Sequence, residues 1–532
     1  MTKQANHPLT LETTRNEDDL NSFTRFVVPF AWRRETISAP GDASPYYREI
    51  DQATNGFDAR RKYFTHETGK VLYKKAKWLE LAGFAQNKYQ WARGGDIHLQ
   101  DGRCIQAKMK PPRVVLFEWS GNHENNLLQT GFLVVDICLL PKGENVPILD
   151  DLLTFNELFR STDQPYKLLD EKFREHLQQA RWSFLDREHR DYTKRWLELL
   201  ALPAQIDGQW YRLIGFSAEE ENAGSVLDIY ADNRGYVWSA AILEKGMAGL
   251  QTLARGTSFL PEDYGHWIRL LNVDSASDCP SKTHREVSGY EKQWAAERTY
   301  KRWIHYGTWY GFSYHSGVML SGPGKFATDF ATFYFDIVLL LFYIRVSLFR
   351  FSNRLTDLAD RLLNADEKLR EEFTQLRKDF ARFTILYQFP LLSNQQQAIE
   401  MYNLARNHFD IEAFHNEVKD EIQETHAFLD MEQNKKLNES ATRISYWGIP
   451  FATAAVVTGI LGMNINDFNF YRCWLTGDPL CNGVNWEAII LVLIVLGVTA
   501  LFWFVTWLYL KKIEDSGRCY IVEPQPNRKP KK

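Results

Sequence analysis

The stretch Ile444–Asn464 reads ISYWGIPFATAAVVTGILGMN and carries no charged side chain. As a helix rising about 1.5 Å per residue it is roughly 31 Å long, which is enough to cross the hydrocarbon core of a bilayer. A second uncharged run, AIILVLIVLGVTALFWFVTWLYL, extends over Ala488–Leu510. The two runs predict a hairpin of transmembrane helices, 444–464 and 488–510, joined by a loop over residues 465–487.

Basic residues flank this hairpin before its first run and after its second, where a basic tail occupies residues 511–532. Because cytoplasmic flanks are enriched in Lys and Arg, both ends of the chain are expected in the cytoplasm and the connecting loop outside. The first thirty residues are charged throughout and lack the apolar stretch of a secretory signal, which agrees with this topology. The predicted location is the inner (plasma) membrane. The flanking residues are Lys435, Lys436, Arg443, Lys511 and Lys512.

A third apolar run, Phe330–Phe349, is interrupted by Asp336 and Arg345. Charged side chains are expensive at the centre of a bilayer, and the uninterrupted part of this run is too short to span one. We therefore expect Phe330–Phe349 to form a buried strand or helix of the cytoplasmic part.

The loop between the two predicted spans contains Cys473 and Cys481, which bracket the turn-forming residues Gly477, Asp478 and Pro479. The loop is expected in an oxidising compartment, where disulfides form and persist. A Cys473–Cys481 disulfide is predicted, and two unpaired thiols are the alternative.

Residues 1–324 predict an α/β cytoplasmic domain. Apolar, β-branched runs typical of strands alternate with helical patterns, of which Tyr166–Leu202 is the longest. Residues 325–443 read as a helical bundle followed by a stalk helix. The predicted fold class is thus an α+β membrane protein with a cytoplasmic domain, a helical stalk and a two-helix hairpin. The strand-like runs begin at Val114, Gly131, Tyr211, Val226 and Tyr236.

The stalk helix is expected to begin near Gln395, because no Gly or Pro occurs from there to Trp447. It continues directly into the first predicted span. An apolar seam at helical spacing should pack against the bundle, and its predicted members are Phe414, Val418, Ile422 and Leu429. The opposite face is acidic, which is typical of a solvated surface and is also compatible with cation binding; its residues are Glu412, Glu417, Asp420, Glu421 and Glu424.

The first span ends in Gly462-Met463-Asn464, preceded by Thr458-Gly459-Ile460-Leu461. A tripeptide at the end of the penultimate span, a short outer loop, one further span and a basic tail together resemble the CorA metal-ion transporter superfamily. The resemblance extends to Asn438, which matches an Asn at the cytoplasmic end of the family's pore. It covers the last hundred residues well and the remainder only in architecture.

This resemblance implies a homopentamer in which the first span of each copy lines a central pore. Two spans cannot enclose a pore alone, so copies must assemble in a ring. The amide oxygens of five Asn464 side chains then face the metal ion at the outer mouth, and Ile444 and Asn438 form an apolar constriction and an inner polar ring. Mg²⁺, or another divalent cation, is the expected transported ion, recognised through its hydration water, and the same ion is a candidate regulator; no tightly bound cofactor is expected. The implied pore residues are Gly462, Met463, Asn464, Thr458, Ala455, Ala452, Ile444 and Asn438.

Other functional classes find less support in the sequence. A net charge of -4 without a basic face makes a nucleic acid an unlikely partner. No phosphate-binding loop, nucleophile elbow or zinc-protease motif occurs, so an enzyme is not expected. One alternative is a ligand-gated CorA-like effector of a bacterial defence system, in which the large cytoplasmic domain senses a nucleotide signal. Another is a membrane-anchored binding protein that conducts nothing.

Overall fold

The computed structural model describes a large part of the chain, divided into two compact units, Met1–Ile422 and Gln423–Lys532. The predicted domain boundary at residue 324 falls inside the first unit. The described residues are 9–12, 22–32, 35–41, 45–50, 57–82, 94–99, 102–117, 129–160, 181–182, 199–213, 234–244, 261–274, 289–322, 326–362, 367–387, 391–463, and ten residues between 493 and 511.

The strands among these residues form one mixed, largely antiparallel sheet of fifteen strands. Its main path is β13 (Thr299–Tyr300), β14 (Thr308–Phe312), β15 (Ser316–Ser321), β12 (Tyr236–Ile242), β1 (Phe23–Trp32), β8 (Gln129–Leu140), β7 (Arg113–Leu116), β4 (Lys77–Ala82), β3 (Tyr46–Glu49), β10 (Pro203–Ile206), β11 (Gln209–Arg212) and β2 (Glu35–Thr36). Off this path lie β5 (Gly94–His98), β6 (Cys104–Met109) and β9 (Arg181–Trp182). The β12–β15 and β3–β10 pairs are parallel.

The centre of the sheet is β1, which pairs antiparallel with β8 on one side and β12 on the other. All ten residues of β1 are buried, and so are all seven of β12. Strands covered on both faces read as continuous apolar runs, and this explains why FTRFVVPFAW and YVWSAAI show little alternation. The run predicted at Gly131 is confirmed as part of β8.

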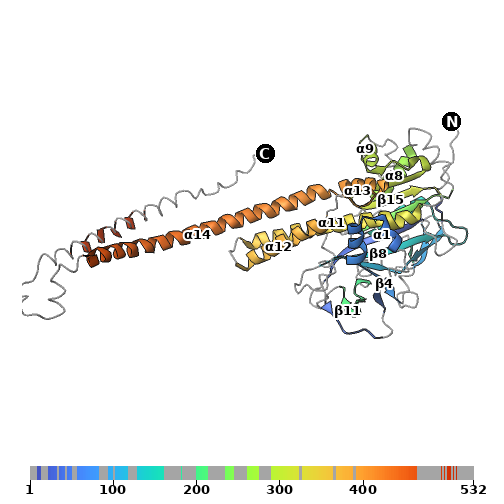
Figure 1. Ribbon diagram of the computed structural model, residues 1–532. Helices are drawn as coiled ribbons and strands as arrows, with labels where there is room; N and C mark the ends of the chain where they lie inside the picture. Colours follow the sequence, from blue (N-terminus) through green and yellow to red (C-terminus); the bar gives the residue numbers. More distant parts are fainter. Residues whose placement is uncertain are drawn as a thin grey trace, which may run out of the picture. The chain divides into compact units, whose positions relative to one another are not determined.

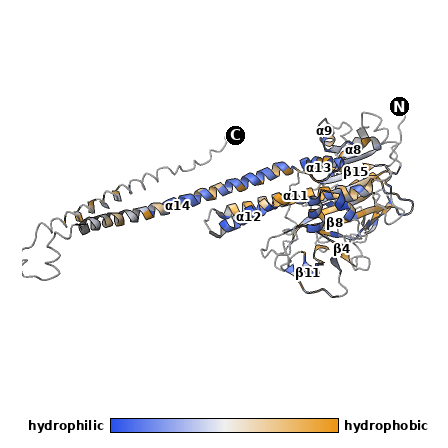
Figure 2. Cartoon of the chain, in the orientation of Figure 1, coloured by the Kyte–Doolittle hydropathy of each residue, from blue (hydrophilic) through white to orange (hydrophobic). Residues whose placement is uncertain are grey.

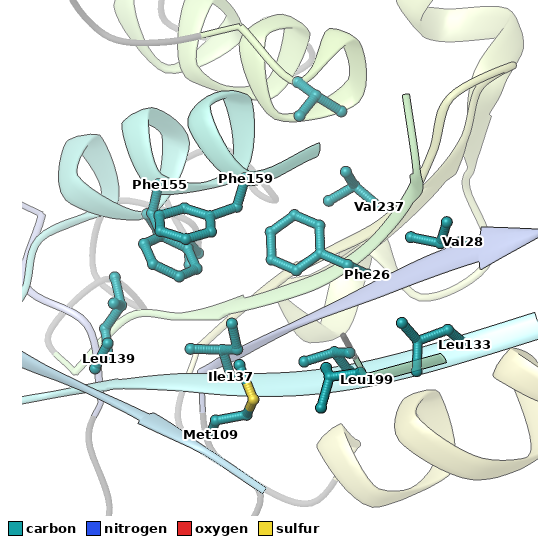
Figure 3. Packing of buried hydrophobic residues seen from close by; sticks show 14 of the residues in the cluster. Phe26, Val28, Met109, Leu133, Ile137, Leu139, Phe155, Phe159, Leu199 and Val237 are labelled. Atoms are coloured by element: carbon teal, nitrogen blue, oxygen red, sulfur yellow. The ribbon is translucent and has the colours of Figure 1, made fainter. Parts of the chain in front are cut away.

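One face of this centre is covered by α3 (Leu149–Arg160) and α8 (Pro261–Asn272). The ring of Phe26 on β1 contacts those of Phe155 and Phe159 on α3, at 6.1 and 6.3 Å between centroids. Figure 3 shows the two α3 rings beside Phe26, with Ile137 of β8 in the same apolar layer. This layer is the main hydrophobic core of the first unit.

The opposite face is covered by α10 (Ala327–Asp329), the π-turn η8 (Phe330–Tyr334) and α11 (Phe335–Leu362), which follow one another without a break (Figure 1). The Trp238 indole of β12 stacks on Phe330 at 4.0 Å and donates a hydrogen bond to the Phe330 carbonyl at 3.0 Å. Phe342 of α11 packs 5.4 Å from Phe132 of β8. The helical run therefore belongs to the core of the sheet domain.

The remaining described elements complete the first unit and begin the stalk. After β3 come α1 (Phe57–Tyr63), α2 (His66–Lys70) and the π-turn η1 (Val71–Lys75); α9 (Gly289–Arg298) precedes β13, and η7 (Ile304–Tyr306) precedes β14. The chain then closes with α12 (Glu367–Tyr387), α13 (Gln396–His408) and α14 (Ile411–Met463).

The prediction that Phe330–Phe349 is buried is confirmed, and the element is a helix. Among the described residues one helix, Ala327–Ala359, is long and apolar enough to cross a membrane, and 83% of its most apolar part is buried inside the protein. The two charged residues that interrupt the apolar run, Asp336 and Arg345, have protein partners. Asp336 is fully buried and accepts hydrogen bonds from the Arg60 guanidinium and the Tyr73 hydroxyl. Arg345 donates to the Tyr314 carbonyl at 2.9 Å.

A second buried charge cluster joins the sheet to the same helical run. Arg25 of β1 pairs with Asp136 of β8, at 2.5 Å from Nε to Oδ1, and donates to the Ala331 carbonyl at 2.8 Å. Arg113 contacts the other oxygen of Asp136 at 2.7 Å. Burial alone would raise the pKa of Asp136, but the two guanidinium groups hold it at about 2. The carboxylate therefore remains charged and anchors η8 to the sheet.

Two predictions about helices are wrong. Within the expected helix Tyr166–Leu202, residues Arg181–Trp182 form strand β9, where Trp182 pairs with Ile97 of β5. Pairing with a neighbouring strand thus overrides local helical propensity there. The expected helix from Gln395 is also broken, since α13 ends at His408 and α14 begins at Ile411. Asp410 between them has a φ of 52°, a left-handed conformation that a continuous helix cannot contain.

The strand-like runs at Val114, Tyr211 and Tyr236 are confirmed as parts of β7, β11 and β12. The run at Val226 lies outside the described residues.

Replacing Asp336 by Asn should strongly destabilise the first unit. The change leaves the Arg60 charge buried without its counter-ion, which typically costs about 3–5 kcal/mol. Thermal unfolding followed by circular dichroism measures the loss. Asp58→Asn is a matched control, because the Asp58–Arg61 pair is exposed and such pairs contribute about 0–1 kcal/mol. Equal melting temperatures for the two variants would contradict the assigned role of Asp336.

Candidate ion pathway and its stalk

The first part of α14 packs against α12 through two matching apolar seams. In α12 the buried residues alternate at spacings of four and three, as in a coiled coil, and those in α14 do the same. His415 of α14 stacks on Phe380 of α12 at 5.4 Å, and further along the α12 seam Phe383 and Tyr387 contact Tyr343 of α11. The buried positions are Leu369, Phe373, Leu376, Phe380, Phe383 and Tyr387 in α12, and Ile411, His415, Val418 and Ile422 in α14.

Three of the four predicted seam residues are confirmed as buried, namely Val418, Ile422 and Leu429. Phe414 is only half-buried, because the seam passes through its neighbour His415. A histidine is not an obvious seam residue in a sequence, which explains the error of one position.

His415 is the polar member of this seam. Its Nε2 lies 3.3 Å from the Thr384 hydroxyl of α12. Burial lowers its pKa, and the nearby charges of Lys419 and Arg406 lower it further, whereas a hydrogen bond with Asn416 acts in the opposite direction. The neutral imidazole is therefore the form that fits the packed stalk.

Beyond Leu429 nearly all of the described side chains of α14 are exposed in the single chain. The exposed fractions are 57% for Leu437 and 73% for both Ile444 and Phe451. Figure 2 shows that the first part of α14 is hydrophilic outside its seam and that the colours turn paler and more hydrophobic toward its end. A helix of this composition requires lipid or other protein chains around it.

The implied pore residues lie along one seam of α14. Asn438, Ala452, Ala455 and Gly462 follow one another at intervals of 14, 3 and 7 residues, which is heptad spacing. Ile444 and Thr458 are 14 residues apart, so they flank this seam at equivalent positions. Heptad spacing keeps a set of residues on the side where several identical helices meet.

The described part of this seam is solvent-facing. Asn438, Ile444, Ala452 and Ala455 are exposed, and the space around Gly459 is open, with no atom within 4 Å of an added Cβ. The helix includes Thr458, Gly462 and Met463, whose side chains are outside the described set. Asn464, Cys473 and Cys481 lie outside the described residues, so the Asn464 site and the disulfide stay predictions.

Gly448 and Pro450 fall within α14 without ending it. Proline inside a helix lacks the N–H that would bond to the carbonyl four residues earlier. Such prolines are common in transmembrane helices, where neighbouring groups satisfy the freed carbonyl. The position of Pro450 therefore agrees with a span that begins near Ile444.

No family model, curated protein or solved structure matches this chain. The resemblance to CorA-type transporters accordingly rests on the residues between Asn438 and Asn464 and on their order relative to the second apolar run.

Among the described residues, no group of three or more His, Cys, Asp or Glu side chains gathers closely enough to hold a metal ion. The acidic face of the stalk is extended along α14, and its members Glu417 and Asp420 are exposed. The arrangement does not form a chelating cage.

The joint between α13 and α14 is buried against the sheet domain. Phe409 is 1% exposed, and its ring lies 5.5 Å from that of Tyr236 on β12 and 6.5 Å from that of Phe342 on α11. Burial raises the pKa of Tyr236 well above its usual value, so its hydroxyl stays neutral. The start of α14 is thus clamped to the two central layers of the first unit, a connection that sequence reasoning missed.

Acidification should weaken the packing of the stalk through His415. The unfolded histidine takes up a proton near pH ~6.5, whereas the folded residue does so only at lower pH because its pKa is lowered. The stability contribution of neutral His415 is therefore present above this window and is lost as the pH falls through it. We expect the melting temperature of His415→Gln to fall less between pH 7.5 and pH 5 than that of the unchanged protein.

The control is His426→Gln, which removes a histidine from the same helix outside the buried seam. Its melting temperature should fall with acidification as far as that of the unchanged protein. An identical acid response of the His415 variant would show that this imidazole does not govern the pH dependence.

Proposed function

We propose that the chain is a CorA-like divalent cation channel, with Mg²⁺ as the conducted ion. The observation that carries the proposal is α14 itself. This one uninterrupted helix leaves a folded domain, enters an apolar run and reaches Gly462-Met463, and its heptad seam of small and polar residues is exposed in the single chain. A lipid anchor needs only an apolar surface and has no use for a polar and small-residue seam.

The assembly proposed is a homopentamer in the inner membrane with both chain ends in the cytoplasm. Copies of α14 supply the inner wall, and the second apolar run, Ala488–Leu510, supplies the lipid-facing wall. Closing a ring buries the exposed Ile444 and Asn438 positions against the symmetry axis and against neighbouring copies. This accounts for apolar side chains that no described element of the same chain covers.

The residues along the axis then act in sequence on a hydrated ion. Five Asn464 amide oxygens accept hydrogen bonds from the waters of Mg²⁺, an ion that gives up its hydration shell reluctantly. Ala452 and Ala455 are small and leave room for a hydrated ion in the middle of the pathway. The Ile444 ring is an apolar constriction that conducts when wetted and closes when dry, and Asn438 provides a polar ring at the cytoplasmic end.

A ligand-gated form of the same pore is the second candidate, and the Phe409 joint favours it. Because Phe409 packs against both β12 and α11, a change in the packing of the sheet domain alters the start of α14 directly. A signal molecule bound by the first unit would therefore act on the pore helix through existing contacts.

The decisive test is ion flux through the reconstituted protein. Liposomes containing a Mg²⁺-sensitive dye should report uptake with the unchanged chain, and Asn464→Ala should lower the initial rate by about tenfold or more, equivalent to at least ~1.4 kcal/mol of barrier. Asn466→Ala is the matched control, since it removes the same side chain two residues beyond the tripeptide.

Equal flux through the Asn464 and Asn466 variants would contradict the role given to Asn464. Absence of flux from an assembled, unchanged protein would reject a constitutively open channel and would leave the ligand-gated pore in its place.

A further inference from the structure

The exposed faces of α12 and α14 carry opposite charges. On α12 the basic face consists of Arg377, Lys378 and Arg382, all exposed, while the intervening Asp379 is half-buried and turned toward Arg354, 3.8 Å away. On α14 the acidic face consists of Glu417, Asp420 and Glu424, also exposed. Most of these exposed charges thus separate by helix, and the exposed charges of opposite sign include Glu371 on α12 and Lys419 on α14.

This separation is unfavourable within an isolated chain. Lys378 and Arg382 are four residues apart, as are Asp420 and Glu424, and Glu417 and Asp420 are three apart. Like charges at these spacings are neighbours on a helix surface and destabilise it. The repulsion between like charges within each face would be relieved if a surface of opposite charge lay against that face.

The two faces point to opposite sides of the helix pair and lie at the same level along it. The seams face one another, since Phe380 and Thr384 of α12 both contact His415 of α14, so the exposed faces are directed away from each other. The same two contacts also show which residues of α12 and α14 lie at the same height along the helix pair. In an antiparallel pair with equal rise, these contacts place Arg377 and Lys378 about level with Asp420 and Glu417.

An exposed apolar side chain accompanies the basic face. Ile385 lies seven residues after Lys378 on the same side of α12 and is 80% exposed. A large aliphatic side chain left in water next to a row of cations is typical of a contact surface with an apolar centre and a charged rim.

We propose that the basic face of α12 in one copy docks on the acidic face of α14 in the next copy. Two different, complementary faces make a heterologous contact, which closes into a ring when repeated by rotation. The inference rests on the proposed ring assembly and deepens it, because it assigns the contact between adjacent stalks. It also accounts for the acidic face without a metal site. An anionic lipid surface would satisfy the basic face alone and leave the acidic face unexplained.

Charge reversal tests this contact in the full-length protein purified in detergent. Glu417→Lys/Asp420→Lys makes both faces basic, and Arg377→Glu/Lys378→Glu makes both acidic. Each double variant should raise the concentration needed for half-assembly by about tenfold or more, measured by mass photometry. Combining all four changes in one chain restores opposite charges at every contact and should return assembly to the level of the unchanged protein.

The control is Asn353→Lys/Asp357→Lys, which places comparable positive charge on the exposed side of α11 and should leave assembly unchanged. Circular dichroism melting checks that each variant is folded, and recovery by the fourfold variant excludes a folding defect as the cause. High salt should weaken assembly of the unchanged protein and narrow its difference from the double variants.

Double variants that assemble like the unchanged protein would overturn the proposal, and so would a fourfold variant that remains as dissociated as the doubles. Basic-face variants that assemble normally but lose binding to vesicles of anionic lipid would assign that face to the membrane surface and also overturn it. A monomeric unchanged protein would reject the ring together with this contact. An assembled protein that conducts no ion would reject the channel and leave the contact standing.

Discussion

A charged side chain inside an apolar helix is stable only where the protein supplies its counter-charge, and this constraint decides which part of the chain can face lipid. Asp336 lies at the start of α11, and Arg60 and Tyr73 reach it from an earlier part of the sequence. Without these partners α11 would be equally compatible with a membrane span. With them it becomes the central helix of the sheet domain, and the membrane candidates narrow to the two uncharged runs after residue 443.

The later part of the stalk shows the opposite situation, because its apolar side chains are covered by no described part of the same chain. The first turns of α14 are partly covered by α12, as the contact between His415 and Phe380 shows. Further along the helix, the side chains of Ile444 and Phe451 are exposed. The same helix is therefore partly covered by the folded domain near its start and exposed further along, where the proposed assembly would cover it.

Sequence patterns predicted those strands and helices that depend on the local spacing of apolar residues. The strands β8 and β12 are continuous apolar runs, and α14 has helical periodicity, so both types were recognisable. The order of the strands in the sheet and the buried ion pairs could not be recognised in the sequence. The partners Arg25 and Asp136, and likewise Arg60 and Asp336, lie far apart in the chain and meet only in the folded protein. The break at Asp410 was missed for a related reason. It contains neither Gly nor Pro, and tertiary packing of Phe409 imposes it. The pore residues came from resemblance to a family, and periodicity supports only their shared side of the helix.

The break at Asp410 is also the point at which the sheet domain is coupled to the start of α14. A non-glycine residue in the left-handed region is unfavourable, so surrounding contacts must maintain it. Those contacts are the packing of Phe409 between Tyr236 and Phe342, at the junction of β12 and α11. The helix α14 begins directly after this buried joint and is continuous from Ile411 through the Ile444 position. In the ring of stalks that we propose, a change at this joint in one copy would also alter its contacts with both neighbours, and the copies are then expected to change state together.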